Sequence, residues 1–244
     1  MATELPAKTE QVLEVALHPA HRKVYDKHLQ RERQRVLGLL EDMDKNRMAI
    51  FRALTTLRQL ALDPSLVDDE HRDLAVSAKV TTLVEQLTEL MAEGHRALVF
   101  SSFTGFLGKV REALEEAGID YSYLDGSTRN RAARIDYFKE SGAPVFLISL
   151  KAGGFGLTLT EADYVFVLDP WWNPAAEAQA VDRTHRIGQT RPVNVYRMVS
   201  TGTIEEKVVA LQERKRQLFD SVVDSGAFKT GAISAKDIRD LLDG

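Results

Sequence analysis

The chain has 244 residues, 44% of them hydrophobic, and a formal net charge of −4 at pH 7. These values allow one large globular domain but exclude a surface coated with positive charge for nucleic acid, and the absence of cysteine excludes disulfide scaffolds and thiolate metal sites. No signal peptide opens the sequence and no apolar run approaches the ~18 residues of a membrane span, so we expect a soluble, intracellular protein with no membrane partner.

The N-terminal part of the chain changes from a strand pattern to a helical pattern. Residues 10–17 alternate between apolar and polar side chains, as in a short β-strand. From residue 20 to residue 62, apolar residues recur near helical spacing among many charges, which predicts two or three helices. We therefore expect a linker strand over residues 1–18 and a helical appendage over residues 19–73.

The rest of the chain alternates between helix and strand. A helix is expected to begin at Ser77 and to stop at Gly94. Short apolar, β-rich segments follow, and the strands expected from them are 97–101, 121–124, 145–150, 164–168 and 194–199. Continuous apolar strands separated by helices predict a parallel sheet covered on both faces. The expected fold is thus an α/β doubly wound sheet over residues 74–221, followed by a C-terminal helical tail over residues 222–244.

Glycines, small hydroxyl residues and a lysine follow several of the predicted strands. In a doubly wound sheet, ligands collect where the carboxyl ends of the strands meet the following loops. Such residues let backbone N–H groups approach an anion, although any strand-to-helix loop prefers Ser, Thr and Gly as well. The candidates are Ser102, Gly126, Ser127, Thr128, Ser149, Lys151, Gly153 and Gly154. Because no Gly-Lys-Ser or Gly-Lys-Thr follows the last two, that loop is not a Walker A phosphate cradle.

The segment QAVDRTHRIGQ, residues 179–189, has the sharpest pattern in the chain. Pro174 suits a first helical turn and Gly188 suits a helix end, so we expect a helix over this segment. Four polar residues would then form one stripe on it: Gln179, Asp182, Arg183 and Arg186. Two arginines on one face form a fork suited to phosphate oxygens. An exposed helix with an ion pair between Asp182 and Arg186 explains the same spacing equally well.

The two tryptophans of the chain, Trp171 and Trp172, follow the strand expected at 164–168 and precede Asn173. At the ligand-binding edge of a sheet, an exposed aromatic side chain can stack on a base or sugar, and Asn can hydrogen-bond a groove edge. Packing of at least one tryptophan in the core is the alternative.

Taken in order, five motifs resemble those of the second RecA-like lobe, the helicase C-terminal domain, in the Swi/Snf family of superfamily-two helicases. They are VFSSFT (99–104), LDGST (124–128), SLKAGGFGLTLTEAD (149–163), LDPWWNP (168–174) and QAVDRTHRIGQ (179–189). The resemblance extends over roughly residues 8–220, and the opening segment is similar to the one that joins the two lobes in that family. RNA helicases of the DEAD-box type usually carry HRxGR, so Gln189 favours the Swi/Snf family.

The resemblance implies an ATP-driven translocase that moves along double-stranded DNA and remodels chromatin or another nucleoprotein. It implies that Arg183 and Arg186 reach the γ-phosphate of ATP held by a first lobe, with Arg186 as the better candidate for an arginine finger. The nucleotide side would also include Gly153, Gly154, Gln179 and Asp182. The DNA side would include Ser102, Gly126, Ser127, Thr128, Ser149, Lys151, Trp172 and Asn173. Ser102 departs from the Gln that is common at its place in the family.

The lobe-one residues of that family, the Walker A lysine and the acid pair for magnesium, have no counterpart in the sequence. We therefore expect ATP and Mg²⁺ to be held mainly by a first RecA-like lobe, which is a partner together with double-stranded DNA. The chain by itself is expected to be monomeric and inactive. An RNA helicase lobe is one alternative, disfavoured by WWNP and RIGQ, and a non-catalytic fragment that binds DNA or protein is another. The absence of cysteine and the Ala- and Arg-rich usage favour a bacterial source, and hence a place in the cytoplasm or nucleoid.

Overall fold

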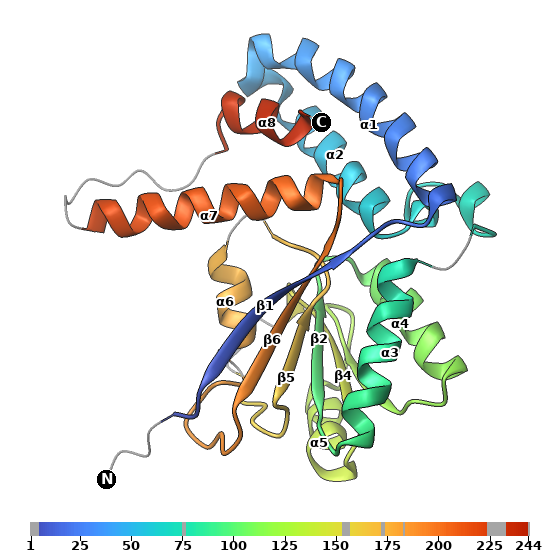
Figure 1. Ribbon diagram of the computed structural model, residues 1–244, viewed down its shortest axis with the longest axis vertical. Coiled ribbons are helices and arrows are strands. Elements are labelled where there is room, and N and C mark those ends of the chain that lie inside the picture. The colour runs from blue at the N-terminus through green and yellow to red at the C-terminus, as the bar shows by residue number, and fades with distance from the viewer. Residues whose placement is uncertain are drawn as a thin grey trace. The chain divides into compact units, whose positions relative to one another are not determined.

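The computed structural model describes residues 5–74, 77–152, 157–171, 174–182, 184–223 and 233–243. The chain divides into two compact units (Figure 1). The first contains the sheet and is built from Met1–Val15, Ala78–Trp171 and Ala175–Val199. The second is helical and is built mainly from Ala16–Ser77 and Ser200–Gly244.

The described strands of the first unit form a six-stranded sheet in the order β1-β6-β5-β2-β4-β3. They are β1 (Lys8–Val15), β2 (Ala97–Ser101), β3 (Tyr121–Leu124), β4 (Val145–Ser149), β5 (Tyr164–Val167) and β6 (Val193–Ser200). The pairs from β6 through to β3 are parallel, and every residue of β2 and β4 is buried. Strands that are buried on both faces must be apolar throughout, which is the pattern read from the sequence. The expected α/β doubly wound fold is confirmed.

Helices connect the strands of this unit. Those described are α3 (Ala78–Ala92), α4 (Thr104–Glu116), α5 (Arg131–Ser141) and α6 (Pro174–Val181). In α5 the Asn130 side chain accepts a hydrogen bond from the Ala133 N–H at one end, and Gly142 closes the other end with φ 78°. Glycine enters this left-handed region without a steric penalty, so it ends the helix where β4 must begin shortly afterwards.

The second unit is an assembly of helices around its own apolar core. Its α-helices in the described ranges are α1 (Pro19–Leu39), α2 (Met43–Leu62), α7 (Ile204–Val223) and the shorter α8 (Ala235–Leu242), with short 3-10 turns at Leu40–Asp42, Pro64–Leu66 and Asp69–His71. Tyr25 lies in this core, and its hydroxyl oxygen accepts a hydrogen bond from the Ile204 N–H at 2.7 Å. Burial raises the pKa of Tyr25 above its ordinary value. No helix in the described part of the chain combines the length and the apolar character needed to cross a membrane.

The compact units do not follow the linear segments expected from the sequence. Strand β1 lies at the edge of the sheet beside β6, where the Val193 N–H donates to the Ala7 carbonyl at 2.9 Å. Helix α7, expected at the end of the sheet-containing segment, contributes Ile204, Val208 and Leu211 to the core of the helical unit. The apolar face of an amphipathic helix reveals that it is buried, but not which core receives it.

Candidate functional site

The carboxyl ends of neighbouring parallel strands meet at one edge of the sheet. Ser101 at the end of β2 lies opposite Ser149 at the end of β4, and the Leu150 N–H donates to the Ser101 carbonyl at 2.9 Å. Ser102 and Lys151, the residues that continue these strands, therefore lie at the same edge. Ser102 and Ser149 are buried, whereas Lys151 is exposed and forms no hydrogen bond or ion pair with any residue that the structure describes.

The carboxylate of Asp169, just beyond β5, holds the loop after β2. It is only 1% exposed and accepts hydrogen bonds from the Ser101 hydroxyl at 2.6 Å and from the Ser102 N–H at 3.1 Å. The Ser101 oxygen in turn accepts from the Phe103 N–H at 3.1 Å, directly before α4. The backbone donor of Ser102 is thus already directed at a carboxylate. No local sequence pattern indicates this role of Asp169, because its partners lie 67 and 68 residues away.

We expect Asp169→Ala to lower the free energy of unfolding by about 1 to 3 kcal/mol, because buried donors of Ser101 and Ser102 would lose an acceptor. Asp169→Asn keeps one oxygen acceptor and should therefore be less destabilising. Urea denaturation of the chain measures both effects. A stability of Asp169→Ala equal to that of the unmodified chain would contradict this bracing role.

The loop after β3 is shaped by Asp125. One of its carboxylate oxygens accepts from the Ser127 N–H at 2.8 Å and from the Ser127 hydroxyl at 2.7 Å, and the other accepts from the Tyr123 hydroxyl at 2.9 Å. Burial acts to raise the pKa of Asp125, but the hydrogen bonds from Ser127 and Tyr123 outweigh it and hold the pKa below its ordinary value. Burial and the bond to Asp125 raise the pKa of Tyr123 to about 12. Gly126 and Ser127 are exposed and Thr128 is half-buried, so a phosphate at this loop would compete with Asp125 for the donors of Ser127.

The helix expected over residues 179–189 is wrong beyond Val181, where α6 ends. The Val181 carbonyl accepts from the Thr184 hydroxyl at 2.7 Å and from the N–H groups of Thr184 at 3.1 Å and His185 at 3.3 Å. The chain then turns, and Gly188 takes φ 107°. Gln179 on α6, Asp182 just after it and Arg186 in the turn are all exposed, but they do not form one helical stripe. The described residues contain no ion pair between Asp182 and Arg186.

The turn that carries Arg186 lies near the amino ends of the strands. The Gln189 side-chain amide donates to the Ala162 carbonyl at 2.9 Å, two residues before β5 begins, and the Gln189 N–H donates to the Arg186 carbonyl at 2.9 Å. A Cβ atom on Gly188 would lie 3.9 Å from the Thr160 hydroxyl oxygen. Among the described candidates, Arg186 thus lies near the amino ends of the strands, whereas Ser102 and Lys151 lie at their carboxyl ends.

Five candidate residues lie outside the described residues: Gly153, Gly154, Trp172, Asn173 and Arg183. Within the described ranges, no group of three or more His, Asp or Glu side chains is placed to hold a metal ion.

Known proteins are similar to this chain in sequence. Residues 78–188 match the model of the helicase conserved C-terminal domain. The DNA repair protein RAD5 of Cryptococcus neoformans is 42% identical over 176 residues, which cover 69% of this chain and 14% of that protein. The SNF2 domain-containing protein ENL1 of Oryza sativa is 36% identical over 229 residues, which cover 90% of this chain and 23% of that protein. The chain thus spans less than a quarter of the length of these relatives.

Solved structures show the same similarity. The SWI2/SNF2 ATPase core of Sulfolobus solfataricus in complex with dsDNA is 30% identical, with a TM-score of 0.72 over 91% of this chain and 47% of that one. The SWI2/SNF2 ATPase C-terminal domain from the same organism is 25% identical, with a TM-score of 0.69 over 96% of this chain and 97% of that one. With the five motifs in order on a parallel sheet, the chain belongs to the Swi/Snf family and contains its RecA-like helicase C-terminal domain.

Proposed function

We propose that this chain is the second motor lobe of an ATP-dependent, double-stranded DNA translocase that remodels nucleoprotein complexes. It would work with a first RecA-like lobe, which would provide most of the contacts that hold ATP and Mg²⁺. The relatives that support this include a DNA repair protein and an ATPase core solved with dsDNA. The observation that carries the proposal is the exposed Arg186, which has no partner among the described residues and lies on a turn whose base is fixed by buried hydrogen bonds.

Arg186 is the proposed arginine finger. Its side chain forms no hydrogen bond or ion pair with any residue in the described part of the chain, whereas Arg191, five residues later, lies 3.4 Å from the Asp163 carboxylate. A guanidinium that no described residue of its own lobe contacts is available to phosphate oxygens, and its planar fork matches two of them. Bound ATP supplies a phosphoryl group on which negative charge is redistributed in the transition state, and Arg186 would stabilise that charge. Arg183 is the second candidate.

Gln179 and Asp182 are proposed to flank the nucleotide, together with Gly153 and Gly154. Both side chains are exposed and neither has a partner among the described residues. The amide of Gln179 can donate to a phosphate oxygen, whereas the carboxylate of Asp182 can only accept from a donor such as a ribose hydroxyl. Asp182 is therefore proposed to lie away from the phosphates.

The carboxyl edge of the sheet is the proposed DNA side. Lys151 is an exposed point charge without a partner among the described residues, which suits a phosphate. The other proposed phosphate contacts are Ser102, Gly126, Ser127, Thr128 and Ser149, and Trp172 and Asn173 are proposed to touch the duplex. A chain with net charge −4 that grips only a few phosphates needs no more than this local set.

We expect weak, sequence-independent binding of duplex DNA that falls as salt rises. The logarithm of the affinity should fall with the logarithm of the salt concentration by about 0.9 per phosphate contacted. Lys151→Ala should reduce this slope by about 1, while Lys45→Ala, an exposed lysine of the helical unit, serves as the matched control. Fluorescence anisotropy over a salt series measures the slopes. Binding that is insensitive to salt, or that strongly prefers one sequence, would contradict the proposal.

The function itself is tested by DNA-stimulated ATP hydrolysis in the two-lobe protein and by its loss in Arg186→Ala. A non-catalytic DNA- or protein-binding fragment predicts no such hydrolysis. An RNA helicase lobe predicts that RNA, and not duplex DNA, stimulates hydrolysis. Assays with duplex DNA, with RNA and without nucleic acid therefore distinguish the three proposed functions.

A further inference from the structure

The side-chain amide of Gln189 is buried and fully hydrogen-bonded. It is 8% exposed, and its nitrogen donates to the carbonyls of Ala162 at 2.9 Å and Thr184 at 3.1 Å. Its oxygen accepts from the N–H groups of Thr190 at 2.9 Å and Arg191 at 3.0 Å. An amide has two N–H donors and two acceptor positions, and all four are used here. The Gln189 side chain thus joins both ends of the turn formed by residues 184–191 to the segment before β5.

The residues inside this turn are exposed. Ile187 is 88% exposed, and Arg186 and Gly188 are exposed on either side of it. The backbone of Arg186 is held from within the turn, because its carbonyl accepts from the Gln189 N–H at 2.9 Å. The base of the turn is therefore fixed in the fold while its tip presents a charged and an apolar side chain to solvent.

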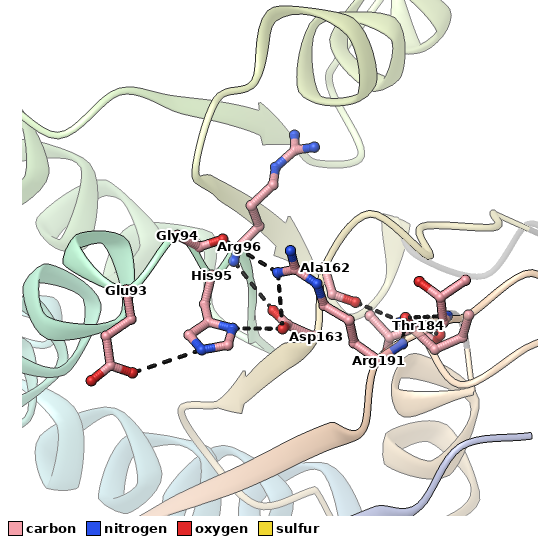
Figure 2. Close-up of polar contacts among 10 residues, drawn as sticks. Glu93, Gly94, His95, Arg96, Ala162, Asp163, Thr184 and Arg191 are labelled. Carbon is pink, nitrogen blue, oxygen red and sulfur yellow. Dashed lines mark hydrogen bonds and ion pairs between the residues drawn. The ribbon is translucent and has the colours of Figure 1, made fainter.

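A second set of contacts fixes the far end of the turn (Figure 2). The Asp163 carboxylate, 2% exposed, lies 2.6 Å from Nδ1 of His95 and accepts from the Arg96 N–H at 3.3 Å. Arg191 reaches the same carboxylate at 3.4 Å and donates to the Gly94 carbonyl at 3.3 Å. The segment after Gln189 is thus tied to the residues that precede β2 and β5. This tie does not depend on Gln189, so the turn should remain attached when the amide is replaced.

We infer that Gln189 is a positioning residue for Arg186. The inference rests on the proposed function of Arg186 as an arginine finger. Gln189 does not contact the nucleotide, because its amide is buried and has no polar group left for a ligand. It holds the turn so that the guanidinium reaches the transferred phosphoryl group in a single geometry. A misplacement of about 1 Å at a reacting group can cost about 10²-fold in rate, so such a clamp has a measurable effect.

The test is the DNA-stimulated ATPase of the two-lobe protein carrying Gln189→Met, which keeps the length of the side chain and removes its four hydrogen bonds. We expect kcat to fall by about 10- to 100-fold, while KM for ATP changes by less than about threefold, because the loss is confined to the transition state. The matched control is Gln212→Met, since Gln212 is also a buried glutamine, 2% exposed, but lies on α7 in the helical unit. It should lower Tm comparably and leave kcat within about threefold.

A double-mutant cycle separates positioning from general damage. In the Arg186→Ala background, Gln189→Met should lower kcat by less than about twofold further, because the group through which it acts is gone. A full further loss in that background would overturn the inference. If Arg186→Ala lowers kcat and Gln189→Met leaves it within about threefold, the inference alone fails. If Arg186→Ala has no effect, the proposed role of Arg186 as the arginine finger fails, and this inference fails with it.

Gln189→Glu provides a second variant in case Gln189→Met does not fold. Its carboxylate can still accept from Thr190 and Arg191, but it opposes the carbonyls of Ala162 and Thr184 until it is protonated and can donate to one of them. The kcat of Gln189→Glu relative to the unmodified protein should therefore rise as the pH falls from about 8 to about 6. A kcat ratio that stays constant over this pH range would contradict the positioning role of Gln189.

Discussion

Replacing Arg186 by alanine in the two-lobe protein should lower kcat for ATP hydrolysis by about 10³-fold or more, because a charge supplied to the transition state is lost. Nucleotide affinity should change much less, since the phosphates are proposed to be held mainly by the first lobe. Stability should be nearly unchanged, because the side chain is exposed and has no partner among the described residues. Steady-state ATPase assays with saturating DNA, beside a thermal melt, measure both quantities.

Arg186→Lys sharpens the test. Lysine keeps the positive charge but loses the planar fork that binds two oxygens at once, so it should fail to restore turnover. Arg52→Ala, an exposed arginine on α2, is the matched control and should leave turnover within about threefold. Turnover within about threefold of the unmodified protein for both Arg186 variants would remove Arg186 from the catalytic residues and leave Arg183 as the candidate.

The chain without a first lobe should hydrolyse no ATP above background, with or without DNA. The sequence has no Walker A loop and no counterpart of the acid pair that holds magnesium in the family it belongs to. Phosphoryl transfer requires these groups to position ATP and to neutralise the charge on its phosphates. The turn that carries Arg186 therefore supplies only a small part of the catalytic site. The two-lobe protein under the same conditions should turn over at rates in the usual range of about 1 to 10³ per second.

A coupled assay on the purified chain tests this prediction, with a circular dichroism melt to show that the chain is folded. Contamination by another ATPase is recognised by comparing the chain with its Arg186→Ala variant. ATP turnover by the purified chain that is abolished by Arg186→Ala would show that the site is complete without a first lobe.

The sequence by itself determined the sheet and most of its elements. The strands expected at 97–101 and 121–124 have the same bounds as β2 and β3. These segments are short, apolar or aromatic, and bounded by turn residues, so local propensity and burial act in the same direction. The motifs at the strand ends likewise indicated the family before any contact was known, because their order and spacing depend on the chain alone.

Only the tertiary structure decided the geometry of the arginine region. Pro174 favours a helix start and Gly188 can end a helix or shape a turn, so the local pattern allows a helix through the whole of 179–189. The turn is held by the hydrogen bond from the Gln189 side-chain amide to the Ala162 carbonyl, 27 residues earlier. The same side chain also bonds the backbone of Thr184, Thr190 and Arg191. Asp169 is a similar case, because it braces a loop 67 residues away. Local patterns report the preferences of neighbours along the chain, whereas a buried polar group takes its partners from whichever segments the fold brings beside it.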